Sequence, residues 1–135
     1  MCMKLTRASS YALHAVVYMA VQKLNKPVAS HHIARARGIP ERFLLKVLKP
    51  LVSARVLHSI KGPNGGYRLA RSPSEVTMLE VVEAVDGPIC GQAPLSQIEG
   101  DGQLDDRLEA ICNQSAEQVR KQLQKIRISE LAGKG

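Results

Sequence analysis

The sequence predicts a mainly α-helical fold that carries one small β-hairpin. Two short helical patterns, residues 31–36 and 40–53, lie on either side of a glycine. Directly after them comes a glycine-rich segment with basic residues, Lys61-Gly62-Pro63-Asn64-Gly65-Gly66-Tyr67-Arg68-Leu69. Farther along, apolar residues recur at alternating spacings of three and four between positions 104 and 126. Together these patterns are typical of a winged helix-turn-helix followed by one long helix.

A longer helix precedes the two short ones, and its predicted range is Thr6 to Lys23. Its apolar positions are dense enough for a largely buried element. Ser30 is a suitable N-cap for the helix of residues 31–36, which should stop at Gly38. Inside the following helix, Pro50 removes a backbone hydrogen bond, so we expect a kink or an early end there.

The glycine-rich segment is predicted to be a hairpin with strands at residues 56–60 and 66–70. Asn64-Gly65 is a dipeptide that tolerates positive φ in a tight turn, and Gly66 allows a partner to approach the backbone closely. Directly after a helix-turn-helix, a hairpin of this kind is typical of a wing that contacts DNA.

Charge is distributed unevenly along the chain. Residues 1–71 carry thirteen Lys or Arg and one acidic residue, for a net charge of +12. The remaining residues carry six basic and eleven acidic residues, for a net charge of −5, which gives the total of +7. Because basic surfaces attract phosphates through counterion release, we expect the first half to bind double-stranded DNA and the second half to lie away from it.

The second half contains a further short helix, a loop and the long helix. Ser74 or Thr77 is the predicted cap of a helix that runs through Val85, and residues 89–103 are predicted to be a mobile loop that contains Cys90. The apolar stripe of the long helix is more than a small domain needs for itself. We therefore expect its partner to be the same helix in a second subunit. Its members are Leu104, Leu108, Ile111, Ser115, Val119, Leu123 and Ile126.

Several classes of function are excluded by what the sequence lacks. There is no nucleophile motif, no phosphate-binding glycine fingerprint and no pair of catalytic carboxylates in the basic half, so we do not expect an enzyme. No apolar run is long enough to span a membrane, and the first five residues do not resemble a secretory signal. With three widely spaced cysteines as well, the chain is predicted to be cytoplasmic, with thiols that are reduced or bound to metal.

Several short segments of the chain together carry a family resemblance. They are Lys4-Leu5-Thr6, Tyr11-Ala12-Leu13, Ile33-Ala34, Gly38-Ile39, the glycine-rich segment through Ala70, and Val81-Val82-Glu83-Ala84-Val85-Asp86-Gly87. These segments resemble the IscR, NsrR and CymR family of bacterial winged-helix regulators. The resemblance implies a homodimer that binds a pseudo-palindromic operator, with repression as the expected outcome, and many members sense iron, redox state or nitric oxide through an iron-sulfur cluster. It implies a winged-helix DNA-binding domain at residues 1–87, a sensor loop at 88–103, a dimerisation helix at 104–127 and a C-terminal tail at 128–135.

The resemblance also implies which residues contact DNA. On the recognition helix, side chains that could reach guanine, thymine or phosphate are Arg42, Phe43, Lys46 and Lys49. On the wing, residues suited to phosphate or minor-groove contacts are Lys61, Gly65, Gly66 and Arg68. The N-terminus offers Lys4, Thr6 and Arg7 for the DNA backbone. Phe43 could equally be a core residue. Leu45 stands where better-known relatives have an acidic residue, so the preferred operator stays open.

The sensor residues depart from the three-cysteine pattern that is common in the family. Cys90 and Cys112 with His14 resemble another branch, which uses two cysteines of one subunit and a histidine from the first helix of the other. A two-iron two-sulfur (2Fe-2S) cluster accepts thiolate and imidazole ligands. Ser10 occupies the position of that branch's carboxylate, so the fourth ligand could be Ser10, Glu109, another residue or solvent.

Three alternatives remain open at this level. Cys112 could be a buried apolar residue and His14 a hydrogen-bonded core imidazole. Oxidation of Cys90 and Cys112 to a disulfide would make a switch that needs no metal. A winged helix can also serve as a protein-interaction module, although that role does not call for the strong positive charge of the first half.

Overall fold

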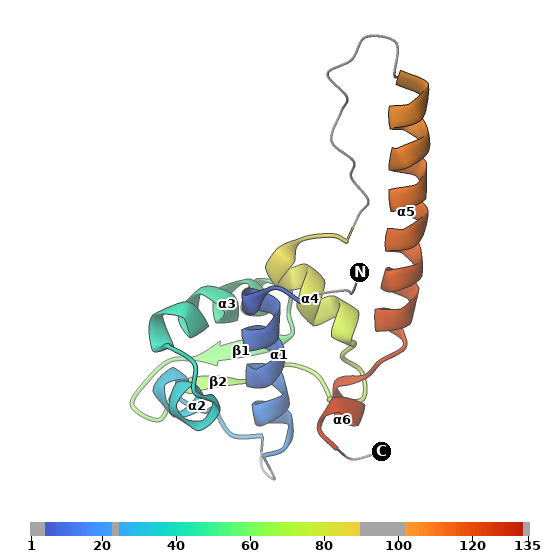
Figure 1. Cartoon of the computed structure of the whole chain (residues 1–135). Helices are drawn as coiled ribbons and strands as arrows, with labels where there is room; N and C mark the ends of the chain where they lie inside the picture. The colour runs from blue at the N-terminus through green and yellow to red at the C-terminus, as the bar shows by residue number, and fades with distance from the viewer. Residues whose placement is uncertain (1–4, 23–24, 90–101, 134–135) are drawn as a thin grey trace.

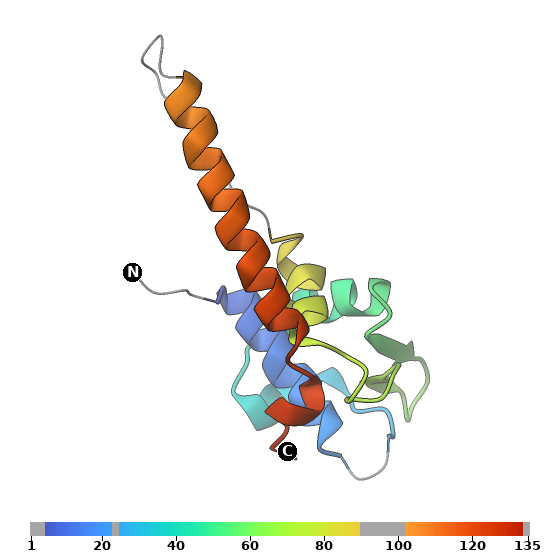
Figure 2. The same ribbon diagram turned by 90° about the vertical axis from the view of Figure 1, so that its right-hand side faces the viewer.

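The computed structural model describes residues 5–22, 25–89 and 102–133. Among the described residues, five helices and a hairpin form a compact body, and helix α5 extends away from it (Figures 1 and 2). In chain order the elements are α1 (Arg7–Ala20), α2 (Ser30–Arg37), α3 (Glu41–Ser53), β1 (Leu57–Ile60), β2 (Gly66–Leu69), α4 (Met78–Asp86), α5 (Gly102–Gln124) and α6 (Ile128–Leu131). The predicted fold class, mainly helical with a hairpin wing, is confirmed.

Helix α1 lies at the centre of the body, where it contacts α2, α3, α4, α6 and β2. Ala12, Ala15 and Val16 are fully buried, and such small side chains allow neighbouring helices to approach closely. The helix begins after Thr6, whose hydroxyl accepts a hydrogen bond from the Ser9 amide at 3.0 Å. The Thr6 and Ser9 hydroxyls also donate to the Asp86 carboxylate, at 2.7 and 2.5 Å. A negative charge therefore lies at the positive end of α1 and ties it to the end of α4.

Helices α2 and α3 form the predicted helix-turn-helix. Gly38 has a φ of 67°, the left-handed conformation that ends many helices, and Ile39 is buried beside it. One local prediction was wrong. Ser30 is not the N-cap, because α2 already includes it and its hydroxyl donates to Glu41 at 3.1 Å. Of the two outcomes expected at Pro50, the early end does not occur, since helix α3 continues to Ser53, the end of its predicted range. Leu48 and Leu51 on either side of Pro50 are fully buried, and their packing offsets the lost hydrogen bond.

The wing is the two-stranded antiparallel hairpin of β1 and β2, in which Leu57 pairs with Leu69 and Ile60 with Gly66. A second backbone pairing joins the wing to the segment between α1 and α2. Val28 and Tyr67 exchange two N–H···O hydrogen bonds, both of 2.8 Å. Gly66 makes this pairing possible, because a Cβ atom at that position would lie 2.3 Å from the Val28 carbonyl oxygen.

The C-terminal part of the chain returns to the body. Thr77, not Ser74, caps α4 in a reciprocal capping box with Glu80. The segment that follows α5 pairs with the residues around the start of α4. The Met78 amide donates to the Ile126 carbonyl at 2.8 Å, and the Ile128 amide donates to the Val76 carbonyl at 2.9 Å. The short helix α6, for which the sequence analysis predicted no element, places Ile128 fully inside the core.

We expect Gly66→Ala to lower the free energy of unfolding by about 1–3 kcal/mol, because the new methyl group would push Val28 away from Tyr67 and occupy a φ of 152°. Gly62→Ala is the matched control, since Gly62 also has a positive φ of 109° but has open space around it. Chemical denaturation followed by circular dichroism measures both. Equal losses in the two variants would mean that the Val28 approach contributes nothing.

Candidate nucleic-acid interface and sensor site

The exposed face of α3 carries the residues that the resemblance assigns to the recognition helix. Leu44, Val47, Leu48 and Leu51 point into the core, which turns Arg42, Phe43, Lys46 and Lys49 toward solvent. Phe43 is 39% exposed, so the alternative of a core phenylalanine does not describe its position. The Arg42 guanidinium lies 5.0 Å and the Lys46 ammonium 5.7 Å from the centre of the Phe43 ring. The ring thus holds two cations side by side on one helix face.

Arg7 of α1 lies beside the same face. A small cavity of about 180 Å³ between the two helices is lined by Arg7, Ala8, Tyr11, Phe43, Lys46 and Val47. The structure therefore brings Arg7 together with Phe43 and Lys46 although they are far apart in the sequence. Thr6 is placed differently, because its hydroxyl is used within the protein by the cap and by Asp86. Lys4 lies outside the described residues.

The wing presents Lys61 as an exposed residue at the start of the turn. Arg68 lies on β2 opposite His58, and its Nε atom is buried without a hydrogen-bond partner among the described residues. Gly65 and Gly66 are both required by the fold, because a Cβ atom at Gly65 would lie 2.1 Å from the Ile60 carbonyl oxygen. Their presence is therefore explained by the hairpin itself, whether or not their amides contact a partner.

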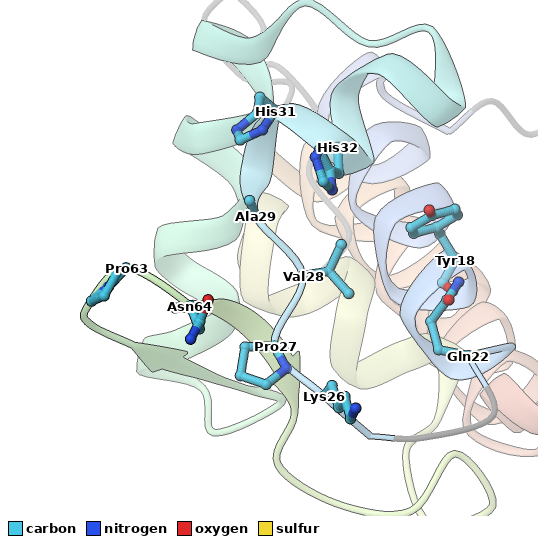
Figure 3. Close-up of a pocket in the computed structure, with 11 residues that line it drawn as sticks. Tyr18, Gln22, Lys26, Pro27, Val28, Ala29, His31, His32, Pro63 and Asn64 are labelled. Atoms are coloured by element: carbon cyan, nitrogen blue, oxygen red, sulfur yellow. The ribbon is translucent and has the colours of Figure 1, made fainter.

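A wide groove runs between the wing turn and the start of α2, with a volume of about 1,120 Å³ (Figure 3). Side chains from three parts of the chain line it, including Lys26, His31, His32, Tyr18 and Asn64. The two imidazole rings meet edge to face with their centres 4.4 Å apart. The sequence analysis did not single out this groove. A signal was present, since Lys26 and the two histidines closely flank the predicted start of α2.

The candidate sensor residues lie on different elements. His14 is exposed on α1, and its Nδ1 accepts a hydrogen bond of 2.6 Å from Arg37 at the end of α2. Because an arginine only donates, the neutral imidazole then carries its proton on Nε2. The alternative of a core imidazole therefore does not describe His14. Ser10 is half-buried one turn earlier on α1.

The cysteines are described only in part. Cys112 is a free, half-buried thiol on α5, whereas Cys2 and Cys90 lie outside the described residues. Glu109 is exposed on the same helix. Across residues 5–22, 25–89 and 102–133, no three His, Cys, Asp or Glu side chains come together in a group that could hold a metal ion. In the same residues, no helix has both the length and the apolar character needed to cross a membrane.

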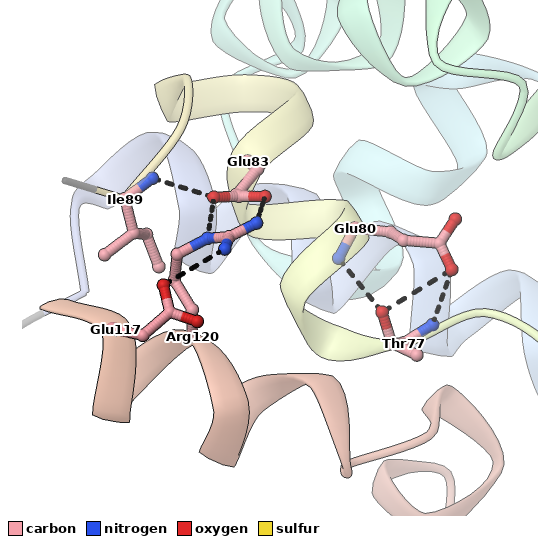
Figure 4. A network of polar contacts seen from close by, with 6 residues as sticks. All are labelled: Thr77, Glu80, Glu83, Ile89, Glu117 and Arg120. Atoms are coloured by element: carbon pink, nitrogen blue, oxygen red, sulfur yellow. Dashed lines mark hydrogen bonds and ion pairs between the residues drawn. The ribbon is translucent and has the colours of Figure 1, made fainter.

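An ion pair links α5 to α4 close to Ile89 (Figure 4). Arg120 donates through Nε to Glu83 at 3.0 Å and through a terminal nitrogen to its other oxygen at 3.5 Å, and the Ile89 amide donates to Glu83 at 2.8 Å. The hydrogen bond from Arg120 lowers the pKa of the Glu83 carboxyl below its ordinary value and raises the pKa of Arg120. A depressed carboxyl pKa means that this contribution to stability is present at neutral pH and is lost as the pH falls through the folded-state pKa. The sequence analysis missed this pair.

Comparison with known proteins supports the resemblance. Curated relatives include protein aau3 of Rhizobium meliloti, 40% identical over 86 residues, which are 62% of this chain and 54% of that protein. The regulator IscR of Aliivibrio salmonicida is 36% identical over 84 residues, which are 62% of this chain and 50% of that one. The chain thus spans about half the length of the curated relatives that it matches.

A solved structure has a similar fold, and a family model matches the sequence. The structure of CymR, the global cysteine regulator of B. subtilis, covers 99% of both chains with a TM-score of 0.76 at 22% identity. The Rrf2 family model, described as iron-dependent transcriptional regulator, matches residues 5–134. That description agrees with the expectation that the chain is not an enzyme. Because the match extends over nearly its whole length, the chain belongs to the Rrf2 family.

Proposed function

We propose that this protein is a homodimeric transcriptional regulator, acting as a repressor, that binds a pseudo-palindromic DNA duplex. The observation that carries the proposal is the α3 face on which Phe43 holds Arg42 and Lys46, beside the wing, in the half of the chain with a net charge of +12. A protruding helix of this kind fits the major groove, and a basic hairpin next to it fits the adjacent minor groove or phosphates. Membership of the Rrf2 family supports the same role.

Individual side chains have distinct roles in this proposal. Arg42 and Lys46 donate to guanine or phosphate, while the Phe43 ring restrains both and contacts a thymine methyl group. Arg7, beside Lys46, reaches a neighbouring phosphate. Lys61 and Arg68 bind the backbone beside the wing, and the unpartnered Nε of Arg68 gains an acceptor there.

We expect Lys46→Ala to weaken binding to the preferred operator by about 1–3 kcal/mol and to relax its sequence preference, because Lys46 reads a base edge. Arg68→Ala should weaken all duplexes alike and reduce the salt dependence, because a phosphate contact carries no sequence information. Lys121→Ala, an exposed lysine on α5, is the control and should bind normally. Fluorescence anisotropy over a range of salt concentrations measures all three. Unchanged affinity in both test variants would show that this face is not the interface.

The dimer proposal rests on the N-terminal half of α5. Leu104, Leu108 and Ile111 are 52%, 41% and 59% exposed, whereas Leu123 near the other end is buried against the body of its own chain. Three large apolar side chains at helical spacing on an extended helix call for a partner. The occupant that we propose is the same face of a second copy, because a pseudo-palindromic duplex presents two equal half-sites to a two-fold symmetric dimer.

We expect the double variant Leu108→Glu with Ile111→Glu to be monomeric, since the seam would have to bury unpaired charges. Gln103→Glu with Ala110→Glu adds the same charge to exposed positions on the opposite side of the same helix and should remain dimeric. Analytical ultracentrifugation distinguishes the two. A dimer that persists in the Leu108 and Ile111 variant would place the subunit interface on another surface.

For the signal, we propose a 2Fe-2S cluster held by Cys90 and Cys112 of one subunit and His14 of the other, with Ser10 as a candidate fourth ligand. The donor set fits the cofactor, because thiolates and an imidazole are ligands that such clusters accept. The family's description as iron-dependent and the free thiol of Cys112 support the proposal. When bound, the cluster supplies one-electron redox chemistry. Ligation through Nε2 of His14 would require the proton on this nitrogen to leave, either to solvent or to Nδ1 once Arg37 has released Nδ1.

The alternative is a metal-free regulator switched by a disulfide between Cys90 and Cys112, or by a small ligand. The similarity of the fold to CymR leaves this alternative as well placed as the cluster. It needs an oxidant that accepts two electrons and both thiol protons as the disulfide forms. The two hypotheses share both cysteines but differ in the role of His14, which only the cluster uses.

We expect anaerobically purified protein to be coloured and to contain equal amounts of iron and acid-labile sulfide. Cys90→Ala and Cys112→Ala should remove the colour, His14→Ala should make it labile, and Cys2→Ala is the control that retains it. Absorption spectra and iron and sulfide analysis provide the measurement. Protein that stays colourless after anaerobic reconstitution, and forms a reversible disulfide instead, would establish the thiol switch.

A further inference from the structure

Among the described residues, α5 is joined to the winged-helix body near its C-terminal end. The first attachment lies just beyond the helix, where the backbone of residues 126–128 pairs with that of residues 76–78 through hydrogen bonds of 2.8 and 2.9 Å. Arg127 and Thr77 form the centre of this pairing, and Ile128 at its end is fully buried. This attachment fixes the position of the C-terminal end of α5 on the body, but one point of attachment does not fix the direction of a helix.

The second attachment is the ion pair of Arg120 with Glu83 of α4. Arg120 approaches both carboxylate oxygens, at 3.0 and 3.5 Å, in a two-pronged arrangement that is more directional than a single contact. Glu83 is in turn held by the Ile89 amide at 2.8 Å. Arg120 also contacts Glu117 at 3.5 Å, but Glu117 belongs to α5 itself and therefore does not join the two elements. Figure 4 shows the guanidinium between the two carboxylates.

Together these two attachments hold the C-terminal part of α5, so they set the direction of the rest of the helix. Arg120 lies about 9 Å along the chain from Ile126 at the helical rise of 1.5 Å per residue, and about 27 Å of α5 extends beyond Arg120 toward Gly102. Measured from Ile126, Gly102 lies about 36 Å away and Arg120 about 9 Å away, so a displacement at Arg120 would be amplified roughly fourfold at the far end of the helix. Leu104, Leu108 and Ile111, the exposed residues of the proposed dimer seam, lie on this far part. Leu123 is also buried against the body, but an apolar contact is non-directional, whereas a two-pronged ion pair has a preferred geometry.

We propose that Arg120 and Glu83 determine which spacing between operator half-sites the dimer accepts. The inference rests on the proposed function, because it requires two subunits joined through α5 and two recognition helices on one duplex. In such a dimer the direction of α5 sets the separation of the two α3 helices. Arg120 and Glu83 contact no DNA in this proposal and act as positioning residues.

The test compares Arg120→Gln and Glu83→Gln with Glu117→Gln, the control that removes the partner of Arg120 on its own helix. An operator is first selected from a random duplex pool with the wild-type protein, and its half-sites are then moved by one or two base pairs in either direction. Wild type and Glu117→Gln should lose roughly tenfold or more in affinity on each shifted duplex, since half-site spacing is a geometric match. In Arg120→Gln and Glu83→Gln we expect the difference between spacings to shrink to about threefold or less, with unchanged salt dependence.

A second measurement is independent of DNA. Amide exchange at Ile89 in the free protein should be faster in Arg120→Gln and Glu83→Gln than in Glu117→Gln. In both test variants the side chain at position 83, which accepts the Ile89 hydrogen bond, is no longer held by an ion pair with α5. Sedimentation and thermal unfolding confirm that each variant is a folded dimer. The double swap Glu83→Arg with Arg120→Glu should restore part of the spacing preference.

The outcomes separate the inference from the function on which it rests. A wild-type protein that binds no duplex would overturn the proposed function and the spacing role with it, and the Ile89 exchange would then report only on the anchor. A wild-type protein that binds its operator, with Arg120→Gln and Glu83→Gln that discriminate between spacings as sharply as Glu117→Gln, would overturn the spacing role alone.

Discussion

The packing around α1 is the constraint on which the rest of the structure depends. With one phenylalanine and no tryptophan, the chain builds its core from aliphatic side chains, and small residues on α1 let five other elements contact this helix. Ala12 and Ala15 have no exposed surface, so a larger side chain at either position would force neighbouring helices apart. Because α1 contacts α2 and α3 directly, this packing determines the position of the exposed face of α3.

Patterns of local origin could be predicted from the sequence. Helical periodicity located α1, α3 and α5, and the glycines located the turn before α3 and the tip of the hairpin. The preference for Thr77 over Ser74 as the cap of α4 was also available in principle, because Glu80 follows Thr77 at the spacing of a capping box. Where local patterns did not predict the structure, contacts with other residues determined it. Ser30 donates to Glu41 instead of capping α2, and buried leucines carry α3 past Pro50.

Contacts between distant charged or polar side chains could not be predicted. Arg120 meets Glu83 across 37 residues, and Arg37 meets His14 across 23, in pairs for which the sequence has no periodicity or motif. The burial of Ile128 is similar, since a single apolar residue near the chain end has no pattern around it. For the candidate sites, the shared exposed face of Arg42, Lys46 and Lys49 on α3 could therefore be predicted from the sequence, but not the partners that hold His14 and Glu83 in place.

The backbone pairing of Val28 with Tyr67 has a consequence for how the proposed interface can adapt. Minor-groove width varies with DNA sequence, and a wing that followed this variation by itself would be a separate reader of shape. Here Tyr67, which lies close to the turn of the wing, shares two hydrogen bonds with the segment that leads into α2. A tilt of the hairpin would move the start of the helix-turn-helix with it. The width of the minor groove at the wing would therefore affect the base contacts that the helix-turn-helix makes in the major groove.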